Sequence, residues 1–505
     1  MNQAPHLSAD TEHVLSRVIR AVLAIAPDEG AIEYDGRWIS WRELATAATA
    51  ISDICHRYST EPTPRVGILL RNTPAHVAAL LGVLLAGGCV VVINPARGDD
   101  RTRTDIAELE LPIVVGTRDD IDSYVGPASP STVITFDDIA TGPEVAAAAG
   151  QGSDRRDDKT GVAIYMLTSG STGPPKRVGL GYDMLARSVL GPDPEHATVP
   201  VALSSGVAIV NAPLVHIGGV FRVLQCIVAA RPFVLLPRFE LNAWADAVRR
   251  YRPKAVSLVP AAVRMVLHSD LTREDLAGIR AVTSGTAPLS AEDSEAFTAK
   301  FGIPVLTSYA ATEFAGGVAA WTLDDYRKYW NTKRGSVGRA NPGARLRVVD
   351  ESGAVLPPGS DGLLEVKPPQ LGPDADWVRT TDLARIDADG FLWILGRADQ
   401  AIIRGGFKII PDTVRSALES HPSVAAAAVV ARTDQRLGAV PVAMVEPRPG
   451  AQVGANELMA HVSGRLARYE IPAEIAIVDV LPRTPSGKPE LAAVRRHFDS
   501  SAAAP

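Results

Sequence analysis

Apolar residues along this sequence follow two patterns in turn, one with the spacing of a helix and one with the continuous run of a buried strand. Residues 41–58 carry apolar side chains at helical spacing, and residues 65–70 form a short apolar run typical of a buried strand. The longest apolar stretch, residues 77–93, is broken by Gly87-Gly88, so we expect a buried helix, a glycine turn and a strand over 89–93. This stretch is shorter than the roughly 20 residues that a membrane-spanning helix needs. Strands and helices that alternate in this way predict an α/β fold with doubly wound, largely parallel sheets.

The alternation continues past the middle of the chain and then changes character. We expect further buried strands at residues 112–115, 162–167, 230–236, 255–259, 279–283 and 305–307. From residue 335 to 395 the pattern consists of short strands separated by turn residues such as Asn341-Pro342-Gly343, which predicts a small β-barrel-like subdomain. The remaining residues combine a predicted helix over 413–420 with strands over 424–431 and 440–446, which predicts a small α+β C-terminal domain.

Composition and charge narrow the class of protein. The chain has 505 residues, which corresponds to roughly three folding units. Apolar residues make up 46% and charged residues 21%, so a mainly disordered or fibrous chain is excluded. The formal net charge is −6 and the basic residues are not clustered, so we expect no nucleic-acid or polybasic membrane surface. The three cysteines are far apart, which argues against zinc or disulfide frameworks, and residues 1–10 lack a signal-peptide pattern, so we expect a cytoplasmic protein.

Residues 167–176 read L-T-S-G-S-T-G-P-P-K and follow directly on the strand predicted over 162–167. Glycines let the backbone approach a ligand closely, and successive amides can form a concave anion-binding site. The hydroxyl groups supply further donors, and the lysine at the far end supplies a cation for a polyphosphate. The spacing differs from the P-loop consensus, which needs four residues between its glycines. The segment therefore indicates a phosphate-binding loop, with a flexible surface loop as the alternative.

This segment resembles the phosphate-binding loop of the adenylate-forming superfamily, which includes acyl-CoA synthetases, peptide-synthetase adenylation domains and luciferases. Further segments resemble family motifs in the family's order: Y-A-A-T-E at 309–313, G-S-V-G-R at 335–339, R-T-T-D at 379–382, G-R-A-D at 396–399 and L-P-R-T-P-S-G-K at 481–488. The resemblance spans essentially the whole chain and points most closely to an acyl-CoA or aryl-CoA ligase. It implies an N-terminal AMP-binding domain over 1–396, a hinge at 397–400 and a mobile C-terminal domain over 401–505.

The resemblance also implies a reaction in two steps. A carboxylate first attacks the α-phosphorus of ATP and forms acyl-AMP and pyrophosphate, and a thiol then takes the acyl group and releases AMP. Because two anions meet in the first step, cations and fixed dipoles must neutralise them. The family pattern assigns Lys488 to the carboxylate and α-phosphate, Thr312 to the α-phosphate and Glu313 to Mg²⁺. It assigns the remaining phosphates to the loop residues Thr168, Ser169, Gly170, Ser171, Thr172, Gly173 and Lys176.

A second set of residues is implied to hold the nucleoside. Asp382 would accept hydrogen bonds from both ribose hydroxyls with help from Arg397, and Tyr309 would stack on adenine. Without the resemblance, Tyr309 is as readily a core aromatic residue, and Asp382 a turn-capping aspartate. The main chain of three further residues would contact the base: Gly285, Thr286 and Ala287.

For the thiol-transfer step, the resemblance implies that the C-terminal domain rotates and brings a glycine loop to the site. Gly405 and Gly406 would let the pantetheine arm of CoA pass along the backbone, although the same pair also fits a plain hairpin turn. His216, in the segment P-L-V-H-I-G-G, would lie beside the acyl group and the pantetheine path. A lone histidine more often has a packing or polar role, so His216 is a candidate rather than an essential base.

Four positions depart from the family pattern. Arg177, Ala310 and Thr381 each add a side chain where the family usually has glycine, and Pro489 is unusual after the loop lysine. None of these changes removes a polar catalytic group. We therefore expect them to affect local geometry and ATP affinity but not the class of reaction.

The motifs predict an AMP-forming carboxylic acid–CoA ligase that uses ATP, Mg²⁺ and CoA. Two alternatives stay open: a stand-alone enzyme that adenylates an acid and loads an acyl carrier protein, and a non-catalytic adenylate-binding homologue. Small residues among the expected pocket walls favour a bulky or extended acid, and fatty, aromatic and polycyclic acids all fit. We expect a small-molecule carboxylic acid as substrate, no nucleic-acid partner, no integral membrane association, and a monomer or homodimer.

Overall fold

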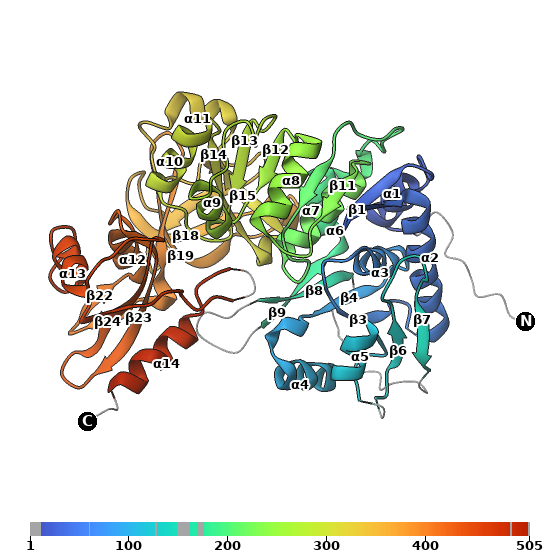
Figure 1. Ribbon diagram of the computed structural model, residues 1–505, viewed down its shortest axis with the longest axis horizontal. Coiled ribbons are helices and arrows are strands. Elements are labelled where there is room, and N and C mark those ends of the chain that lie inside the picture. Colours follow the sequence, from blue (N-terminus) through green and yellow to red (C-terminus); the bar gives the residue numbers. More distant parts are fainter. Residues whose placement is uncertain are drawn as a thin grey trace, which may run out of the picture.

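The computed structural model describes residues 12–59, 61–126, 129–148, 161–168, 176–484 and 487–502. It has the α/β architecture predicted from the sequence, with five sheets and helices packed around them. Figure 1 shows a broad body that contains most of the chain and a smaller C-terminal body, at the red end of the colour scale.

The largest sheet has seven strands and belongs to the first third of the chain. Its strands, in spatial order, are β7 (Glu144–Ala147), β6 (Thr132–Thr135), β5 (Ile113–Gly116), β3 (Arg65–Leu69), β4 (Cys89–Ile93), β8 (Val162–Thr168) and β9 (Lys176–Gly181). The strands from β6 to β8 are parallel, and the two edge strands are antiparallel to their neighbours. The four strands predicted in this region all lie in this sheet, whereas the glycine-containing edge strand β9 was not predicted.

Two further sheets continue the broad body. One contains β10 (Ala208–Val210), β11 (Phe233–Leu235), β1 (Gly30–Tyr34) and β2 (Arg37–Ser40). The other contains β12 (Ala255–Ser257), β13 (Ala281–Ser284), β14 (Val305–Ala311), β15 (Gly316–Ala320) and β16 (Arg339–Ala340). In the second of these, β12, β13 and β14 are parallel, and β15 and β16 continue the sheet in antiparallel pairs.

The short strands predicted between residues 335 and 395 form an antiparallel sheet. It contains β17 (Arg345–Val349), β18 (Asp361–Lys367), β19 (Val378–Ile386) and β20 (Leu392–Arg397). The C-terminal body that follows has its own sheet of β22 (Phe407–Ile409), β21 (Ile402–Arg404), β24 (Gly438–Pro447), β23 (Val424–Asp434) and β25 (Glu474–Ile477). Its helices are α12 (Pro411–Glu419), α13 (Ala455–Ser463) and α14 (Leu491–Ala502).

The helices of the broad body pack between and around its sheets (Figure 1). They are α1 (Val14–Leu23), α2 (Trp41–Tyr58), α3 (Pro74–Leu85), α4 (Asp99–Leu109), α5 (Arg118–Tyr124), α6 (Tyr182–Leu190), α7 (Ile217–Val228), α8 (Leu241–Tyr251), α9 (Pro260–Leu267), α10 (Ala291–Phe301) and α11 (Leu323–Tyr329). Short 3₁₀ turns connect several elements: η1 (Pro95–Arg97), η2 (Pro194–His196), η3 (Thr312–Phe314), η4 (Pro369–Leu371) and η5 (Ala398–Gln400).

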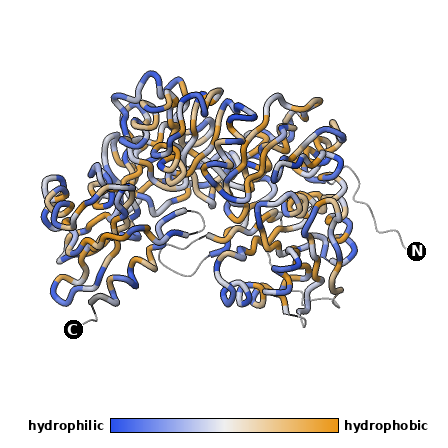
Figure 2. Tube along the Cα trace, in the orientation of Figure 1, coloured by the Kyte–Doolittle hydropathy of each residue, from blue (hydrophilic) through white to orange (hydrophobic). Residues whose placement is uncertain are grey.

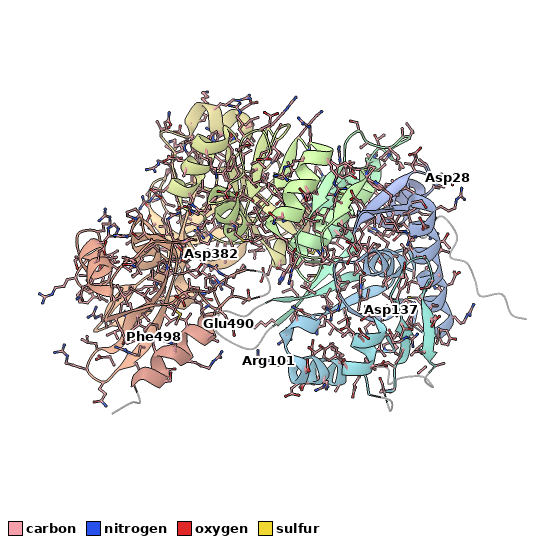
Figure 3. All side chains as sticks on the ribbon, in the orientation of Figure 1. Asp28, Arg101, Asp137, Asp382, Glu490 and Phe498 are labelled. Carbon is pink, nitrogen blue, oxygen red and sulfur yellow. The ribbon has the colours of Figure 1, made fainter. Side chains whose placement is uncertain are left out.

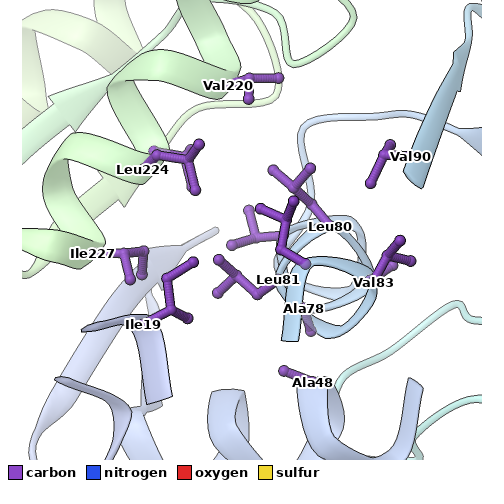
Figure 4. Packing of buried hydrophobic residues seen from close by; sticks show 14 of the residues in the cluster. Ile19, Ala48, Ala78, Leu80, Leu81, Val83, Val90, Val220, Leu224 and Ile227 are labelled. Carbon is purple, nitrogen blue, oxygen red and sulfur yellow. The ribbon is translucent and has the colours of Figure 1, made fainter. Parts of the chain in front are cut away.

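Helix α3 is the centre of the main hydrophobic core, because every one of its residues is buried. Leu80 and Leu81 of α3 lie in one cluster with Leu224 and Ile227 of α7 and with Ile19 of α1 (Figure 4). Figure 2 shows that hydrophobic segments gather in the interior, whereas hydrophilic segments are frequent in the outer helices and loops. This core fixes the position of α7 relative to the sheets, and the N-terminal end of α7 lies at the site described next.

The structure also tests the expectations about membranes and cysteines. Within the described ranges, no helix has both the length and the apolar character needed to cross a bilayer. Cys55, Cys89 and Cys226 are buried and carry free thiols, as expected for small core residues.

Candidate functional site

The site is centred on a tyrosine and an aspartate that are far apart in the sequence. Tyr309 lies on β14, which runs into η3 with Thr312 and Glu313, and its hydroxyl donates a hydrogen bond to Asp382 of β19. Asp382 pairs in register with Arg397 of β20. Burial raises the pKa of Tyr309, and the Asp382 carboxylate raises it further. Burial also raises the pKa of Asp382, although the hydrogen bond from Tyr309 and the charge of Arg397 act in the opposite direction.

Arg397 is held in place by two neighbours. Its Nη2 donates to Oγ1 of Thr381 at 2.7 Å, and its Nε and Nη2 donate to the two carboxylate oxygens of Asp399 at 3.0 and 2.7 Å. Burial lowers the pKa of Arg397, but the hydrogen bonds to Asp399 and its negative charge outweigh the effect of burial. The pKa of Arg397 is therefore raised. Thr381, one of the departures from the family pattern, thus supplies a hydrogen bond that glycine could not make.

Lys488 reaches this cluster from the C-terminal body. It lies in a tight hairpin in which the Thr484 amide donates to the Lys488 carbonyl at 2.7 Å and the Glu490 amide donates to the Pro482 carbonyl at 2.8 Å. Figure 3 labels Asp382 and also Glu490, which is two residues after Lys488. Burial lowers the pKa of Lys488, as does the charge of Arg397, while Glu313 raises it. Lys488 therefore shares one electrostatic environment with residues of the broad body.

His216 stands at the N-terminal end of α7. The helix can begin here because Gly219 lies against the Pro213 carbonyl, where an added Cβ would be only 2.3 Å from the oxygen. Burial, with a smaller contribution from the charge of Lys488, lowers the pKa of His216 to about 4. Its Nε2 is buried without a hydrogen-bond partner. At neutral pH, His216 is therefore an uncharged side chain close to Lys488.

The predicted base-binding segment follows β13. A Cβ at Gly285 would lie 2.8 Å from the Ser308 hydroxyl of β14, so the backbone packs closely there. Thr286 has a φ of 71°, a region that a β-branched residue seldom adopts and that the surrounding structure must hold. Thr286 and Ala287 line a cleft between the two bodies together with Lys488 and Pro489. Val259, Pro260 and Ala261 line the same cleft.

The predicted phosphate-binding loop joins the last two strands of the seven-stranded sheet. Thr168 pairs with Lys176 across β8 and β9, so the two residues that flank the loop lie side by side. The guanidinium of Arg177, the residue after Lys176, is engaged elsewhere. Its Nη1 donates to the Val92 carbonyl at 2.8 Å and its Nη2 to Asp105 Oδ2 at 2.5 Å. The remaining predicted loop residues lie outside the described ranges: Ser169, Gly170, Ser171, Thr172 and Gly173.

Gly405 and Gly406 form the tip of the hairpin between β21 and β22. Both have positive φ, 56° and 91°, as two-residue hairpin turns require. The Gly405 amide donates to the Leu437 carbonyl of the same body at 2.8 Å. In this arrangement of the two bodies, Gly405 and Gly406 have the geometry of a plain two-residue hairpin turn.

Buried charges connect the two bodies beside the cleft. Arg264 of α9 donates to Asp293 of α10 at 2.7 Å (Nε to Oδ2) and lies 3.7 Å from Glu419 of α12. Arg448 of the C-terminal body lies 3.4 Å from the other oxygen of Asp293. The Asp293 and Glu419 side chains are only 7% and 8% exposed, so each depends on its partners for compensation. This network stabilises the arrangement in which Lys488 faces Arg397.

We expect Arg448→Met to lower kcat/KM for pyrophosphate release about fivefold, because a lost ion pair of this exposure costs about 1 kcal/mol. Thioester formation from supplied acyl-AMP should not fall. The two half-reactions are measured separately by phosphate-coupled and CoA-coupled assays. Arg436→Met, which removes an exposed arginine of the same body, is the control. An equal loss in both half-reactions would show that Arg448 does not favour the Lys488-facing arrangement.

Several of these contributions have no motif in the sequence. In the sequence, Thr381 is recognisable only as a residue that replaces a glycine of the family pattern. No neighbouring residue indicates its contact with Arg397. The partners Asp293 and Arg448 are 155 residues apart, and no periodicity relates them. The motif at 396–399 already contains Asp399, whereas no motif indicates the contacts between the two bodies.

Comparison with known proteins identifies two matching family models. The model described as AMP-binding enzyme matches residues 19–373, and the model described as AMP-binding enzyme C-terminal domain matches residues 413–488. The indoleacetate–CoA ligase of Aromatoleum aromaticum is 29% identical and covers 94% of this chain and 96% of its own length. A feruloyl-CoA synthase of an Amycolatopsis species is 28% identical and covers 94% of this chain and 97% of its own length.

Solved structures show the same fold over nearly the whole chain. ATP-bound MatB from Rhodopseudomonas palustris has a TM-score of 0.80 at 27% identity and covers 96% of this chain and 99% of its own. The o-succinylbenzoate CoA synthetase MenE from Bacillus subtilis, in complex with an acyl-adenylate intermediate, has a TM-score of 0.76 at 24% identity, covers 95% of this chain and 97% of its own, and supports the fold alone. The family resemblance and fold class expected from the motifs are thereby confirmed.

Proposed function

This chain belongs to the family of AMP-binding enzymes, and we propose that it is an AMP-forming carboxylic acid–CoA ligase. The enzyme joins a carboxylate to ATP to form acyl-AMP and pyrophosphate, and then transfers the acyl group to the thiol of CoA. The observation that carries this proposal is the position of Lys488, a half-buried cation of the C-terminal body that lines a cleft with Thr286 and Ala287 of the broad body and is subject to the charges of Arg397 and Glu313. A lysine so placed can hold a carboxylate against a phosphate, which is the contact that the first step needs.

The nucleoside is the ligand that fits the cluster around Asp382. The Asp382 carboxylate already accepts the Tyr309 hydroxyl and has oxygen lone pairs left for ribose hydroxyls. Arg397, fixed by Thr381 and Asp399, offers its positive charge to the same ligand. The Tyr309 ring, tied at its hydroxyl, is held in one orientation and so provides a flat surface for a base.

Glu313 is the residue that we assign to Mg²⁺. Its carboxylate is exposed at η3 and interacts electrostatically with both Arg397 and Lys488. Magnesium is commonly held by one or two carboxylates together with substrate phosphates. In the part of the chain that the structure describes, no group of three or more acidic, histidine or cysteine side chains gathers for a metal ion, and one carboxylate fits that mode. When bound, the ion supplies charge neutralisation on the phosphates.

The second step requires a different arrangement of the two bodies. We assign residues 1–396 and 401–505 to the two moving domains and residues 397–400 to the hinge. The Arg397–Asp399 ion pair lies within that hinge, so rotation there would move residues of the nucleoside site and the loop of Lys488 relative to each other. The Gly405-Gly406 hairpin would then approach the acyl group and admit the thiol.

A panel of carboxylic acids tests the reaction class. Pyrophosphate release with acid and ATP alone separates a ligase from a non-catalytic adenylate binder. Hydroxylamine then traps the acyl-AMP, and added CoA or an acyl carrier protein shows which thiol accelerates release of AMP. Acceleration by a carrier protein and not by CoA would favour the alternative, an enzyme that loads a carrier.

The titration of Lys488 predicts the alkaline limit of the first step. The pKa of Lys488 lies below 10.5 because of burial and the charge of Arg397. The protonated form is the active one, so pyrophosphate release should be retained below this pKa and lost as the pH rises through it. In Lys488→Arg, the guanidinium stays charged and the alkaline limit should disappear, although the rate is lower. A profile of kcat/KM against pH in both proteins checks this, and an unchanged limit in the variant would assign it to another group.

A further inference from the structure

A buried asparagine, Asn72, joins two sheets of the broad body at the ends of their strands. It follows β3 of the seven-stranded sheet, and only 6% of its surface is exposed. Its Nδ2 donates to the Ala212 carbonyl at 3.0 Å and to the Leu236 carbonyl at 3.1 Å. Ala212 and Leu236 come shortly after β10 and β11, which are neighbours in another sheet. One side chain therefore ties together the ends of three strands.

The other end of the Asn72 amide makes a third hydrogen bond. The Leu214 amide donates to its Oδ1 at 2.7 Å. Because two carbonyls face one end of the side chain and an N–H group faces the other, the orientation of the amide is fixed. An aspartate here would place oxygen against the two carbonyls, and an alanine would leave three backbone groups without this partner. An asparagine satisfies all three groups at once.

The segment that Asn72 holds, residues 212–214, leads directly into His216. The His216 amide donates to the Pro213 carbonyl at 3.0 Å, and the Gly219 amide donates to the His216 carbonyl at 3.0 Å. The Pro213 carbonyl also lies against Gly219, as described above. The turn at 212–214 is thus packed on the first turn of α7, and the backbone position of His216 follows from the position of this turn.

The His216 ring depends on its backbone for its place. The residue has extended backbone angles at the start of α7, and its side chain makes no capping hydrogen bond to that helix. In the part of the chain that the structure describes, its Nε2 has no hydrogen-bond partner. The charge of Lys488 acts on the ring. A shift of the turn would therefore move the imidazole relative to Lys488, since no bond at Nε2 would hold it back.

We propose that Asn72 is a positioning residue of the acid-activating site, which fixes the turn at 212–214 and thereby holds the His216 imidazole in place beside the acyl group. The proposal rests on the proposed ligase function and deepens it by adding a residue to the same site. Asn72 acts through the backbone of the turn, so it is not itself a catalytic residue.

Replacing Asn72 with alanine removes all three hydrogen bonds. We expect kcat/KM for the acid in pyrophosphate release to fall about tenfold, because small displacements of groups beside a reacting centre are costly. The KM for ATP should stay within about twofold, because the nucleoside cluster is built on β14, β19 and β20 of other sheets. The control is Ser131→Ala. It removes a buried hydrogen bond to the Leu111 carbonyl at the opposite end of the same parallel strands and should change neither value.

A double-mutant cycle with His216→Ala separates positioning from a merely structural role. If Asn72 acts through the His216 ring, Asn72→Ala should change kcat/KM by no more than about twofold in a protein that already lacks the ring. A structural role would give the same loss with and without His216. Equal losses in the two backgrounds would therefore overturn the proposal, as would an unchanged rate in Asn72→Ala alone.

Magnetic resonance of isotope-labelled histidine keeps this test separate from that of the ligase function. The His216 signals are assigned by their loss in His216→Ala and need no turnover. Burial is the main cause of the low pKa of His216, so its pKa should rise toward the ordinary range in Asn72→Ala, and an unchanged titration would contradict the proposal. Absence of pyrophosphate release with every acid counts against the ligase function alone. If Asn72→Ala does not fold, Asn72→Ser, which keeps one hydroxyl, provides the second variant with the same expected changes.

Discussion

Replacing Lys488 with alanine should lower pyrophosphate release from acid and ATP by about a hundredfold to a thousandfold, the usual effect of removing one preorganised charge from a reacting centre. Lys488 is the cation that the C-terminal body contributes to the cluster, while Glu313 stays on the broad body and Arg397 lies at the start of the proposed hinge. Thioester formation from supplied acyl-AMP should stay within about threefold of wild type, because the phosphate bond has already formed. Single-turnover assays of the two half-reactions measure the difference.

Lys254→Ala is the matched control for this experiment. Lys254 is exposed and immediately precedes β12, while Val259, Pro260 and Ala261, which line the cleft with Lys488, follow the opposite end of that strand. The control should leave both half-reactions unchanged. If Lys488→Ala reduced both half-reactions equally, rotation of the C-terminal body between the steps would be wrong.

Replacing Asp382 with alanine should impair both half-reactions, each by about a hundredfold in kcat/KM. The AMP moiety stays bound through both steps, and the carboxylate offers charge-assisted hydrogen bonds worth about 3 kcal/mol together. The variant also deprives the Tyr309 hydroxyl of its acceptor, so the ring is less well oriented. The measurements are the KM for ATP in the first step and the affinity for acyl-AMP in the second.

Asp361→Ala separates the role of Asp382 from a general effect on the sheet. Asp361 lies on β18, next to β19, and forms an exposed ion pair with Arg385 at 2.6 Å. Its removal should change neither step, since an exposed pair of this kind contributes little. A normal KM for ATP in Asp382→Ala would show that the ribose binds elsewhere.

Together the two variants distinguish a residue that acts in one step from a residue that acts in both. Lys488 belongs to the body that is proposed to move, and Asp382 to the body that is proposed to hold the nucleotide. Their different effects therefore test the arrangement of the site as well as the two side chains.

The apolar pattern predicted several elements closely because burial leaves a direct trace in the sequence. The helix expected over residues 41–58 and the strand expected over 89–93 coincide with α2 and β4. Both are bounded by residues with clear local preferences, such as Ser40, whose side chain and Glu43 form a capping box at the start of α2. Strands β9 and β15 were missed because their glycines interrupt the pattern that identifies a strand.

The motifs predicted which residue types the chemistry needs, and the structure brings most of them together. Tyr309, Asp382 and Arg397 meet in one cluster, and the charge of Arg397 acts on Lys488. Gly405 and Gly406 lie instead at a hairpin tip within the C-terminal body. A motif carries no information about which of two arrangements of the bodies is populated. The position of the two glycines relative to Lys488 was therefore not predictable.

The sequence by itself determined the family and many of the helices and strands, and it predicted which residues would face the nucleotide, because these follow from local patterns of burial and residue type. Only the tertiary structure decided that Thr381 holds Arg397, that Arg448 reaches Asp293 across the cleft, and that Asn72 holds the turn before His216. Each of these contacts joins residues whose spacing in the sequence has no period and whose geometry depends on how the sheets pack. Hydrogen bonds and ion pairs act over a few ångströms, and such distances are set by the folded chain as a whole.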